Sequence, residues 1–213
     1  MAWVLITAVL IGTGKSAGQT DDAGQRAGGA SESDGLPFHR DAISRYSLDD
    51  LPRSLSIRYG KDVWLGYDLE RATVCKVWRA PLGKAGLIAS GFVTRSSGTA
   101  LFEDKSREPW QLRQGGVIAP LSTRYLGCSQ RPGYFELSWE LRHDSRVLLL
   151  AERVPMAVQP GVGVAREVQV QGLRPEEALL PPPRARAAWK LTHRGAESPP
   201  AIEGNEWYRL TLR

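Results

Sequence analysis

Apolar side chains recur at every second position through most of the chain that follows Pro52. The clearest example is the segment YFELSWELR at residues 134–142, where aromatic and leucine residues alternate with Glu and Ser. This period is typical of a strand with one buried face, and no segment after Pro52 shows the longer period of an amphipathic helix. We expect the alternating apolar residues to lie in the core: Phe135, Leu137, Trp139 and Leu141.

Turn-forming residues divide the rest of the chain into short pieces. The chain has 14 prolines and 22 glycines, and the apolar stretches between them are four to ten residues long, a length typical of strands. Beyond residues 134–142, we expect strands within residues 86–94, 107–113, 146–154, 164–170, 187–193 and 206–213. Many short strands separated by turns predict an all-β fold, specifically an antiparallel β-sandwich.

The first strands after Pro52 are predicted to form an antiparallel meander, because short turns join them. The expected strands are residues 53–59, 63–68 and 73–78, with turns at 60–62 and 69–71. In the second strand Trp64 is out of phase with Val63 and Leu65. Either one face of the strand, with Trp64 or with Val63 and Leu65, is exposed to solvent, or both faces of the strand are covered. Two further segments differ in kind: a short helix is expected within residues 38–51, and residues 179–187 (LLPPPRARA) are expected to form a stiff loop.

The N-terminus has the pattern of an export signal. Residues 2–12 are an unbroken apolar run, shorter than the ~20 residues that a membrane-spanning helix needs. Ser16 and Gly18 suit the −3 and −1 positions of a signal-peptidase site, so residues 1–18 are predicted to be a signal peptide. The predicted location is periplasmic or extracellular, with no membrane span left after cleavage. A buried N-terminal strand or helix is the alternative, because the run has no Lys or Arg before it.

Residues 19–37 are rich in Gly, Ala, Ser, Asp and Gln and offer almost nothing to bury. They are predicted to be a disordered linker with a net charge of −3, which arises from four acidic residues against Arg26: Asp21, Asp22, Glu32 and Asp34. Residues 38–213 are predicted to be one β-sandwich domain. Its strand-like pattern runs to Arg213, which suggests one module of a longer protein.

Charge and composition argue against several classes of function. The net charge is +5, but the basic residues are scattered, whereas nucleic-acid binding requires a cluster. The three histidines, His39, His143 and His193, have no ligand spacing, so no metal site is predicted. No C-x-x-C-H motif occurs, so no covalent haem site or other cofactor is predicted in this chain.

The two cysteines, Cys75 and Cys128, allow two interpretations. An exported chain is exposed to an oxidising compartment, where an even pair forms a disulfide. Both residues also lie in apolar, strand-like stretches, which is equally compatible with two buried thiols.

Two sets of residues are candidates for function. Asp68 and Glu70 would point to the same face if both lay in a strand, as a catalytic carboxylate pair requires, whereas in a turn Asp68 would bind backbone N–H groups. Three tryptophans are candidates for stacking on a ligand such as a glycan, although core packing is the usual role of Trp in a sandwich: Trp64, Trp78 and Trp110.

The segment from Val63 to Trp78 also resembles a known family. The shared residues are Val63, Trp64, Tyr67, Asp68, Glu70 and the stretch from Val74 to Trp78. They are similar to a bacterial domain of unknown function that occurs in large exported proteins beside cytochrome c modules and sugar-dehydrogenase-like propellers. The similarity covers residues 51–154, with residues 134–154 matching a later strand pair. The family's glycine-rich segment after the tryptophan is replaced here by residues 79–83 (RAPLG).

The resemblance implies a β-sandwich, an extracytoplasmic location and redox or carbohydrate-processing neighbours, and it assigns no catalytic residue. We therefore expect a non-enzymatic binding or scaffold module whose partner is a glycan or a haem-bearing redox protein. The alternative is a carbohydrate-active enzyme that uses Asp68 and Glu70.

Overall fold

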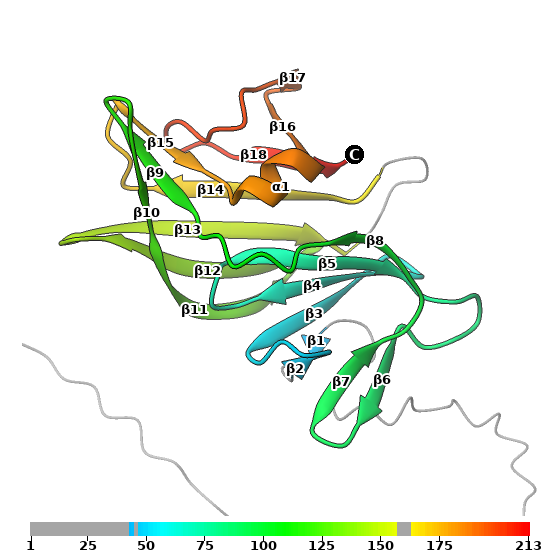
Figure 1. Cartoon of the computed structure of the whole chain (residues 1–213). Coiled ribbons are helices and arrows are strands. Elements are labelled where there is room, and N and C mark those ends of the chain that lie inside the picture. The colour runs from blue at the N-terminus through cyan, green and yellow to red at the C-terminus, as the bar shows by residue number, and fades with distance from the viewer. Residues whose placement is uncertain (1–42, 45–46, 157–162) are drawn as a thin grey trace, which may run out of the picture. The chain divides into compact units, whose positions relative to one another are not determined.

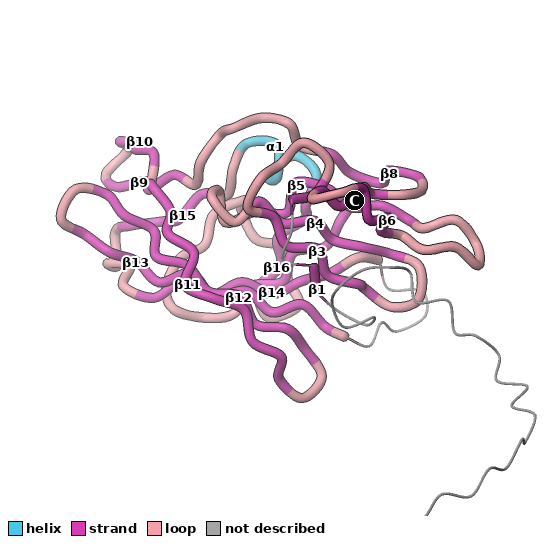
Figure 2. The backbone as a smooth tube through the Cα atoms, turned by 90° about the horizontal axis from the view of Figure 1, so that it is seen from below, coloured by secondary structure: helices cyan, strands magenta, loops and turns pink. Residues whose placement is uncertain are grey.

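The computed structural model describes residues 43–44, 47–156 and 163–213. The predicted signal peptide (1–18) and linker (19–37) lie outside the described residues, as does the start of the predicted domain. The predicted all-β fold is confirmed (Figures 1 and 2): strands account for most of the described chain, and its one described helix is α1 (Pro183–Ala188). Within the described residues, no helix has the length and apolar character needed to cross a membrane.

Two large sheets form most of the fold (Figure 1). The first has the order β1-β3-β4-β5-β8 and consists of β1 (Ile43–Ser44), β3 (Ser54–Tyr59), β4 (Val63–Asp68), β5 (Thr73–Arg79) and β8 (Thr99–Glu103). The second has the order β11-β12-β13-β14-β18-β16-β17 and consists of β11 (Ser122–Arg131), β12 (Tyr134–His143), β13 (Arg146–Pro155), β14 (Ala165–Gln171), β18 (Tyr208–Leu212), β16 (Trp189–His193) and β17 (Ala196–Glu197). All these pairings are antiparallel.

Two three-stranded sheets complete the structure. One has the order β10-β9-β15 and consists of β9 (Gln111–Gln114), β10 (Val117–Pro120) and β15 (Glu177–Leu180). The other has the order β2-β7-β6 and consists of β2 (Ser47–Leu48), β6 (Leu87–Ser90) and β7 (Val93–Ser96), with β2 parallel to β7.

The main core lies between the two large sheets. Leu65 and Tyr67 of β4 and Leu137 and Trp139 of β12 belong to one buried cluster and are fully inaccessible to solvent. The inward-facing residues predicted for residues 134–142 are thus confirmed, because Phe135 and Leu141 are buried in the same cluster.

A second, smaller core covers the other face of the first sheet. Trp64 of β4 stacks on Trp78 of β5, with ring centroids 6.2 Å apart, and Leu48 and Leu87 from the β2-β7-β6 sheet pack against them. A Cβ atom at Gly86 would lie 2.1 Å from Nε1 of Trp64, so the close approach there requires glycine. Both faces of β4 are therefore covered, so Trp64 is buried although it points to the opposite face from Val63 and Leu65.

The main core encloses an ion pair. The Arg166 guanidinium on β14 lies 2.5 Å from Oε2 of Glu152 on β13, and both side chains are essentially inaccessible. The Tyr67 hydroxyl donates a hydrogen bond to the other oxygen of Glu152, and Arg166 lies over the Trp189 ring. Burial raises the pKa of the Tyr67 hydroxyl well above its usual value, so the hydroxyl stays protonated as the donor.

Several segments differ from the prediction. The single strand expected within residues 86–94 is a hairpin of β6 and β7 with a turn at residues 91–92. Strands β8, β10 and β15 were not expected. Strand β11 was not expected either, although it is ten residues long and contains Cys128, whose neighbours in sequence are strand-like.

Residues 183–188 form α1 rather than a stiff loop. Proline fits at the start of this helix because the backbone N–H groups of a first helical turn have no hydrogen-bond partner within the helix. The helix expected within 38–51 is wrong for the described residues, which form β1, β2 and a turn.

Candidate functional site

The turn between β4 and β5 is organised by Asp68. One oxygen of its carboxylate accepts hydrogen bonds from the backbone N–H groups of Glu70 (2.9 Å) and Arg71 (3.2 Å). The other oxygen lies 2.6 Å from Nε of Arg71. Asp68 is 5% exposed, so its carboxylate serves the turn in the way that Asp residues commonly do.

Arg71 connects this turn to the segment after β8. Its guanidinium lies 3.6 Å from Oδ2 of Asp104 and donates a hydrogen bond to the carbonyl oxygen of Ser106. Asp104 is buried, and its Oδ1 accepts a hydrogen bond from the backbone N–H of Ser106 (2.8 Å). The Asp68–Arg71–Asp104 contacts therefore fix two loops against each other.

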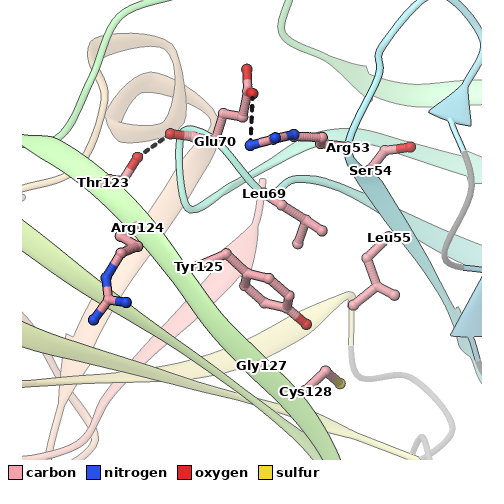
Figure 3. A pocket seen from close by; sticks show the side chains of 10 residues that line it. All are labelled: Arg53, Ser54, Leu55, Leu69, Glu70, Thr123, Arg124, Tyr125, Gly127 and Cys128. Atoms are coloured by element: carbon pink, nitrogen blue, oxygen red, sulfur yellow. Dashed lines mark hydrogen bonds and ion pairs between the residues drawn. The ribbon is translucent and has the colours of Figure 1, made fainter.

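A cavity of about 580 Å³, which we call the edge cavity, opens beside this turn (Figure 3). It lies between the start of β3 in the first sheet and β11 at the edge of the second sheet. Its lining residues come from the residue before β3, the start of β3, the β4–β5 turn and β11: Arg53, Ser54, Leu55, Leu69, Glu70, Thr123, Arg124, Tyr125, Gly127 and Cys128.

The floor of the edge cavity is apolar. In Figure 3 the side chains of Leu55, Leu69, Tyr125 and Cys128 come together below the turn. The Tyr125 ring packs on buried Trp139, with centroids 5.7 Å apart. The floor is therefore supported directly by the main core.

The rim of the edge cavity is charged. Arg53 lies 3.6 Å from Glu70, and both side chains are more than half exposed. The Thr123 hydroxyl donates a hydrogen bond to the backbone carbonyl of Glu70, which joins the turn to β11. On the outer face, Arg124 makes a two-point contact with Glu140 (2.9 and 2.5 Å).

Glu140 is also bound by a second arginine, Arg142, at 2.6 Å. Hydrogen bonds from Arg124 and then Arg142 lower the pKa of the Glu140 carboxyl to about 2. This carboxylate is therefore charged at neutral pH and holds the Arg124 guanidinium on the outer face of β11.

A second cavity of about 280 Å³, the polar cavity, lies on the other side of the turn. Asp68 and Arg71 line it, together with Lys76, which forms an ion pair with Asp49 at 2.9 Å. Glu70 lines the edge cavity instead. The two candidate catalytic carboxylates thus line different cavities, each with its own arginine partner.

The three candidate tryptophans are core residues in the structure. Trp64, Trp78 and Trp110 are 5%, 1% and 0% exposed, and none of them lines either cavity. The indole N–H of Trp78 donates to the carbonyl of Gly86 (2.7 Å), and that of Trp110 donates to the carbonyl of Ala72 (2.9 Å).

No disulfide joins the two cysteines, both of which lie in the part of the chain that the structure describes. The Cys75 thiol is buried and lies 3.3 Å from the carbonyl oxygen of Gly66. Burial, and then the charge of Asp68, raise the pKa of Cys75 to about 12. Cys128 is half-buried and lines the edge cavity. Both cysteines are therefore free thiols in the structure, and of the two Cys75 alone is buried.

Several residues of the edge cavity were not predicted from the sequence: Arg53, Thr123, Arg124 and Tyr125. They come from a turn and from a strand whose apolar alternation is broken, so the pattern gives no signal for them. Among the described residues, which include His143 and His193, no cluster of three or more His, Cys, Asp or Glu side chains could hold a metal ion. Comparison with protein-family models, curated proteins and solved structures found no match to this chain.

Proposed function

We propose that this protein is a non-catalytic β-sandwich binding module whose ligand site is the edge cavity. The observation that carries the proposal is a recess of about 580 Å³ with an apolar floor and a charged rim, placed at the edge of a sheet. Concave sites with apolar walls and a few polar groups are the usual form of ligand sites. Arg53 at the rim favours a ligand that joins an apolar group to a carboxylate, which would compete with Glu70 for the guanidinium.

The alternative, catalysis on carbohydrate by Asp68 and Glu70, has less support. Paired carboxylates must act on the same bond from positions a few ångströms apart. Asp68 is bound to its own turn and to Arg71, and it lines a different cavity from Glu70. A glycan ligand stays within the proposal, but it would have to bind without Trp64, Trp78 or Trp110, since these side chains are buried.

We also propose an extracytoplasmic setting, with a redox or carbohydrate-processing system as its context. Support comes from the apolar N-terminal run and from the family resemblance of residues 63–78. N-terminal sequencing of the protein after expression in a bacterial host tests the export step. We expect a new N-terminus at Gln19 in the periplasmic fraction, whereas an intact N-terminus in the cytoplasm would contradict it.

Alkylation of Cys128 provides a direct test of the binding site. The full-length protein is treated with iodoacetamide in the presence of 3-phenylpropionate or hexanoate, and then with the corresponding neutral amides. We expect the carboxylates to slow modification of Cys128 in a saturable way and the amides to do so less.

Two variants of similar chemistry serve as a matched pair. Arg53→Gln removes the rim cation, whereas Arg209→Gln removes an exposed arginine on β18, outside the cavity lining. We expect protection to weaken only in Arg53→Gln. Equal Cys128 modification with and without every carboxylate and amide would contradict the proposed site.

A further inference from the structure

We propose that the edge cavity receives part of an extended polypeptide, which adds as a strand along the outer edge of β11. In this polypeptide, apolar residues alternate with Asp or Glu. The inference rests on the proposed function, because the same cavity takes the ligand, and it names the class of partner.

The first observation is the position of β11 (Figure 1). It is the first strand in the order of the seven-stranded sheet, and its paired neighbour among the described residues is β12. At ten residues it is longer than the usual strand of five or six. An antiparallel edge strand directs alternate backbone N–H and C=O groups away from its sheet, and strand addition uses these groups.

The second observation is the difference between the two faces of β11. Tyr125 lies opposite Trp139 and Cys128 lies opposite Leu137, so Tyr125 and Cys128 face the core. Arg124, which lies opposite Glu140, belongs to the outer face.

Arg131 lies opposite Tyr134 of β12. The residue after Tyr134, Phe135, is buried in the core, so Tyr134 points to the outer face and Arg131 belongs to that face too. The strand has two arginines and no Asp or Glu. The outer face of β11 therefore carries both arginines of the strand, and the middle of its inner face carries Tyr125 and Cys128, which line the edge cavity.

These faces determine what kind of strand fits beside β11. Neighbouring strands lie about 4.8 Å apart, and their side chains point alternately to the two faces of the sheet. Apolar side chains of the added strand would enter the edge cavity, whose opposite wall is Leu55 and Leu69. Its carboxylates would lie on the outer face beside Arg124 and Arg131, where opposite charges on adjacent strands attract.

A bulge in β11 favours a separate partner over a second copy of this chain. The register with β12 shifts between Tyr125 and Gly127, and Leu126 at the shift is 46% exposed. Pairing of β11 with another β11 would bring two such bulges into one ladder. Bulges at sheet edges oppose this kind of self-pairing.

Fluorescence anisotropy with the full-length protein tests the proposal. The probe is a fluorescein-labelled octapeptide of alternating Val and Glu. Its controls are a Val–Lys octapeptide and a Val–Glu octapeptide with alternate backbone nitrogens methylated. We expect the Val–Glu probe to bind tightest. Methylation should weaken binding about ten-fold or more, because two or three backbone hydrogen bonds are lost.

Variants of the protein locate the interaction. Arg124→Gln and Arg131→Gln should each weaken probe binding by about two- to five-fold, the size expected for one exposed ion pair. Arg209→Gln should leave binding unchanged. Circular dichroism and thermal melting of each variant establish that the fold is retained.

Four results would overturn the inference. Equal binding of the methylated and unmethylated probes would indicate a charge contact without strand pairing. Self-association of the protein in competition with the probe would assign the edge to a second copy. Probe binding seen only after Asp21, Asp22, Glu32 and Asp34 are changed to their amides would assign the edge to the chain's own acidic segment. If the Val–Glu octapeptide does not bind but carboxylates still protect Cys128, strand addition alone is overturned. If the octapeptide does not bind and carboxylates do not protect Cys128, the proposed function is overturned too.

Discussion

Trp139 on β12 donates its indole N–H to the backbone carbonyl of Leu69, 3.2 Å away in the β4–β5 turn. This bond joins the two large sheets at the edge cavity, because Leu69 lines the cavity and Trp139 lies in the core beneath it. The Trp139 ring also packs on Tyr125 from one sheet and Tyr67 from the other, with centroids 5.7 and 6.3 Å away. One buried side chain thus contacts Leu69 and Tyr125 on two walls of the cavity.

Two substitutions of Trp139 distinguish the contribution of its hydrogen bond to stability from the contribution of its packing. Trp139→Phe keeps an aromatic ring but leaves the Leu69 carbonyl without its donor, and we expect a loss of about 1–3 kcal/mol in the free energy of unfolding. Trp139→Ala also removes the packing and should cost about 3–5 kcal/mol. Urea denaturation measures both values. Equal losses for the two variants would contradict a separate contribution from packing.

The buried Glu152–Arg166 pair predicts strongly unequal single and double variants. Glu152→Leu leaves Arg166 charged and unpaired in the core and removes the acceptor of Tyr67, so we expect a loss of about 3–5 kcal/mol. Glu152→Leu combined with Arg166→Met removes both charges and should recover much of that loss. Chemical denaturation of the two variants provides the comparison, and a double variant less stable than the single one would oppose this prediction.

The two carboxylates of the turn are predicted to behave differently. Asp68→Ala removes two backbone hydrogen bonds and the Arg71 ion pair from a buried position, and we expect a loss of about 2 kcal/mol or more. Glu70→Gln removes an exposed ion pair and should change stability by less than about 0.5 kcal/mol. Thermal melting of the pair checks this, and equal destabilisation would contradict the structural role of Asp68.

The sequence pattern predicted three of the strands closely. Strand β4 was predicted at its observed bounds, and β12 and β13 within one residue at each end, because burial on one face produces strict alternation in β12 and short polar turns limit all three. The role of Asp68 as a turn residue also followed from its chemistry. Alternation within β4 could not show that its outer face is buried, because the residues that cover this face come from distant parts of the chain, among them the β6–β7 hairpin.

The edge cavity could not be predicted for the same physical reason that β11 was missed. An edge strand is exposed on one side, so polar residues such as Ser129 and Gln130 are tolerated, and the bulge after Tyr125 changes the phase of alternation midway. Arg53 reaches the cavity only because the start of β3 lies near β11, some 70 residues away in sequence. Contacts between the edges of different sheets join residues far apart in the chain, so no local sequence pattern predicts them.

The two thiols are predicted to differ in reactivity. Because burial raises the pKa of Cys75 to about 12, almost no thiolate is present at pH 8. We expect iodoacetamide to modify Cys128 in the native protein and Cys75 only after denaturation. Mass spectrometry of tryptic peptides checks the order, and Cys128→Ser should abolish native modification. Native labelling of Cys75 at a similar rate would contradict its buried position.

Glu140 predicts a titration well below that of an ordinary glutamate. Its pKa of about 2 in the folded protein is below the usual 4.5, because Arg124 and then Arg142 donate hydrogen bonds to the carboxylate. A depressed folded-state pKa stabilises the fold above pH 4.5, and this contribution is lost as the pH falls from about 4.5 towards 2. Both arginine partners are about half exposed, so the effect should be small and should weaken with salt.

NMR titration of the Glu140 carboxyl carbon measures this pKa. We expect a midpoint near 2 in the unmodified protein and a rise towards 4.5 in Arg124→Gln. Arg209→Gln serves as the control and should leave the midpoint unchanged. Strand addition at β11 would add a further change, because an acidic partner strand competes with Glu140 for Arg124. The Glu140 midpoint should therefore rise when the Val–Glu octapeptide is bound and stay constant with the Val–Lys octapeptide. A midpoint near 4.5 without any peptide would contradict the contacts of Arg124 and Arg142 with Glu140.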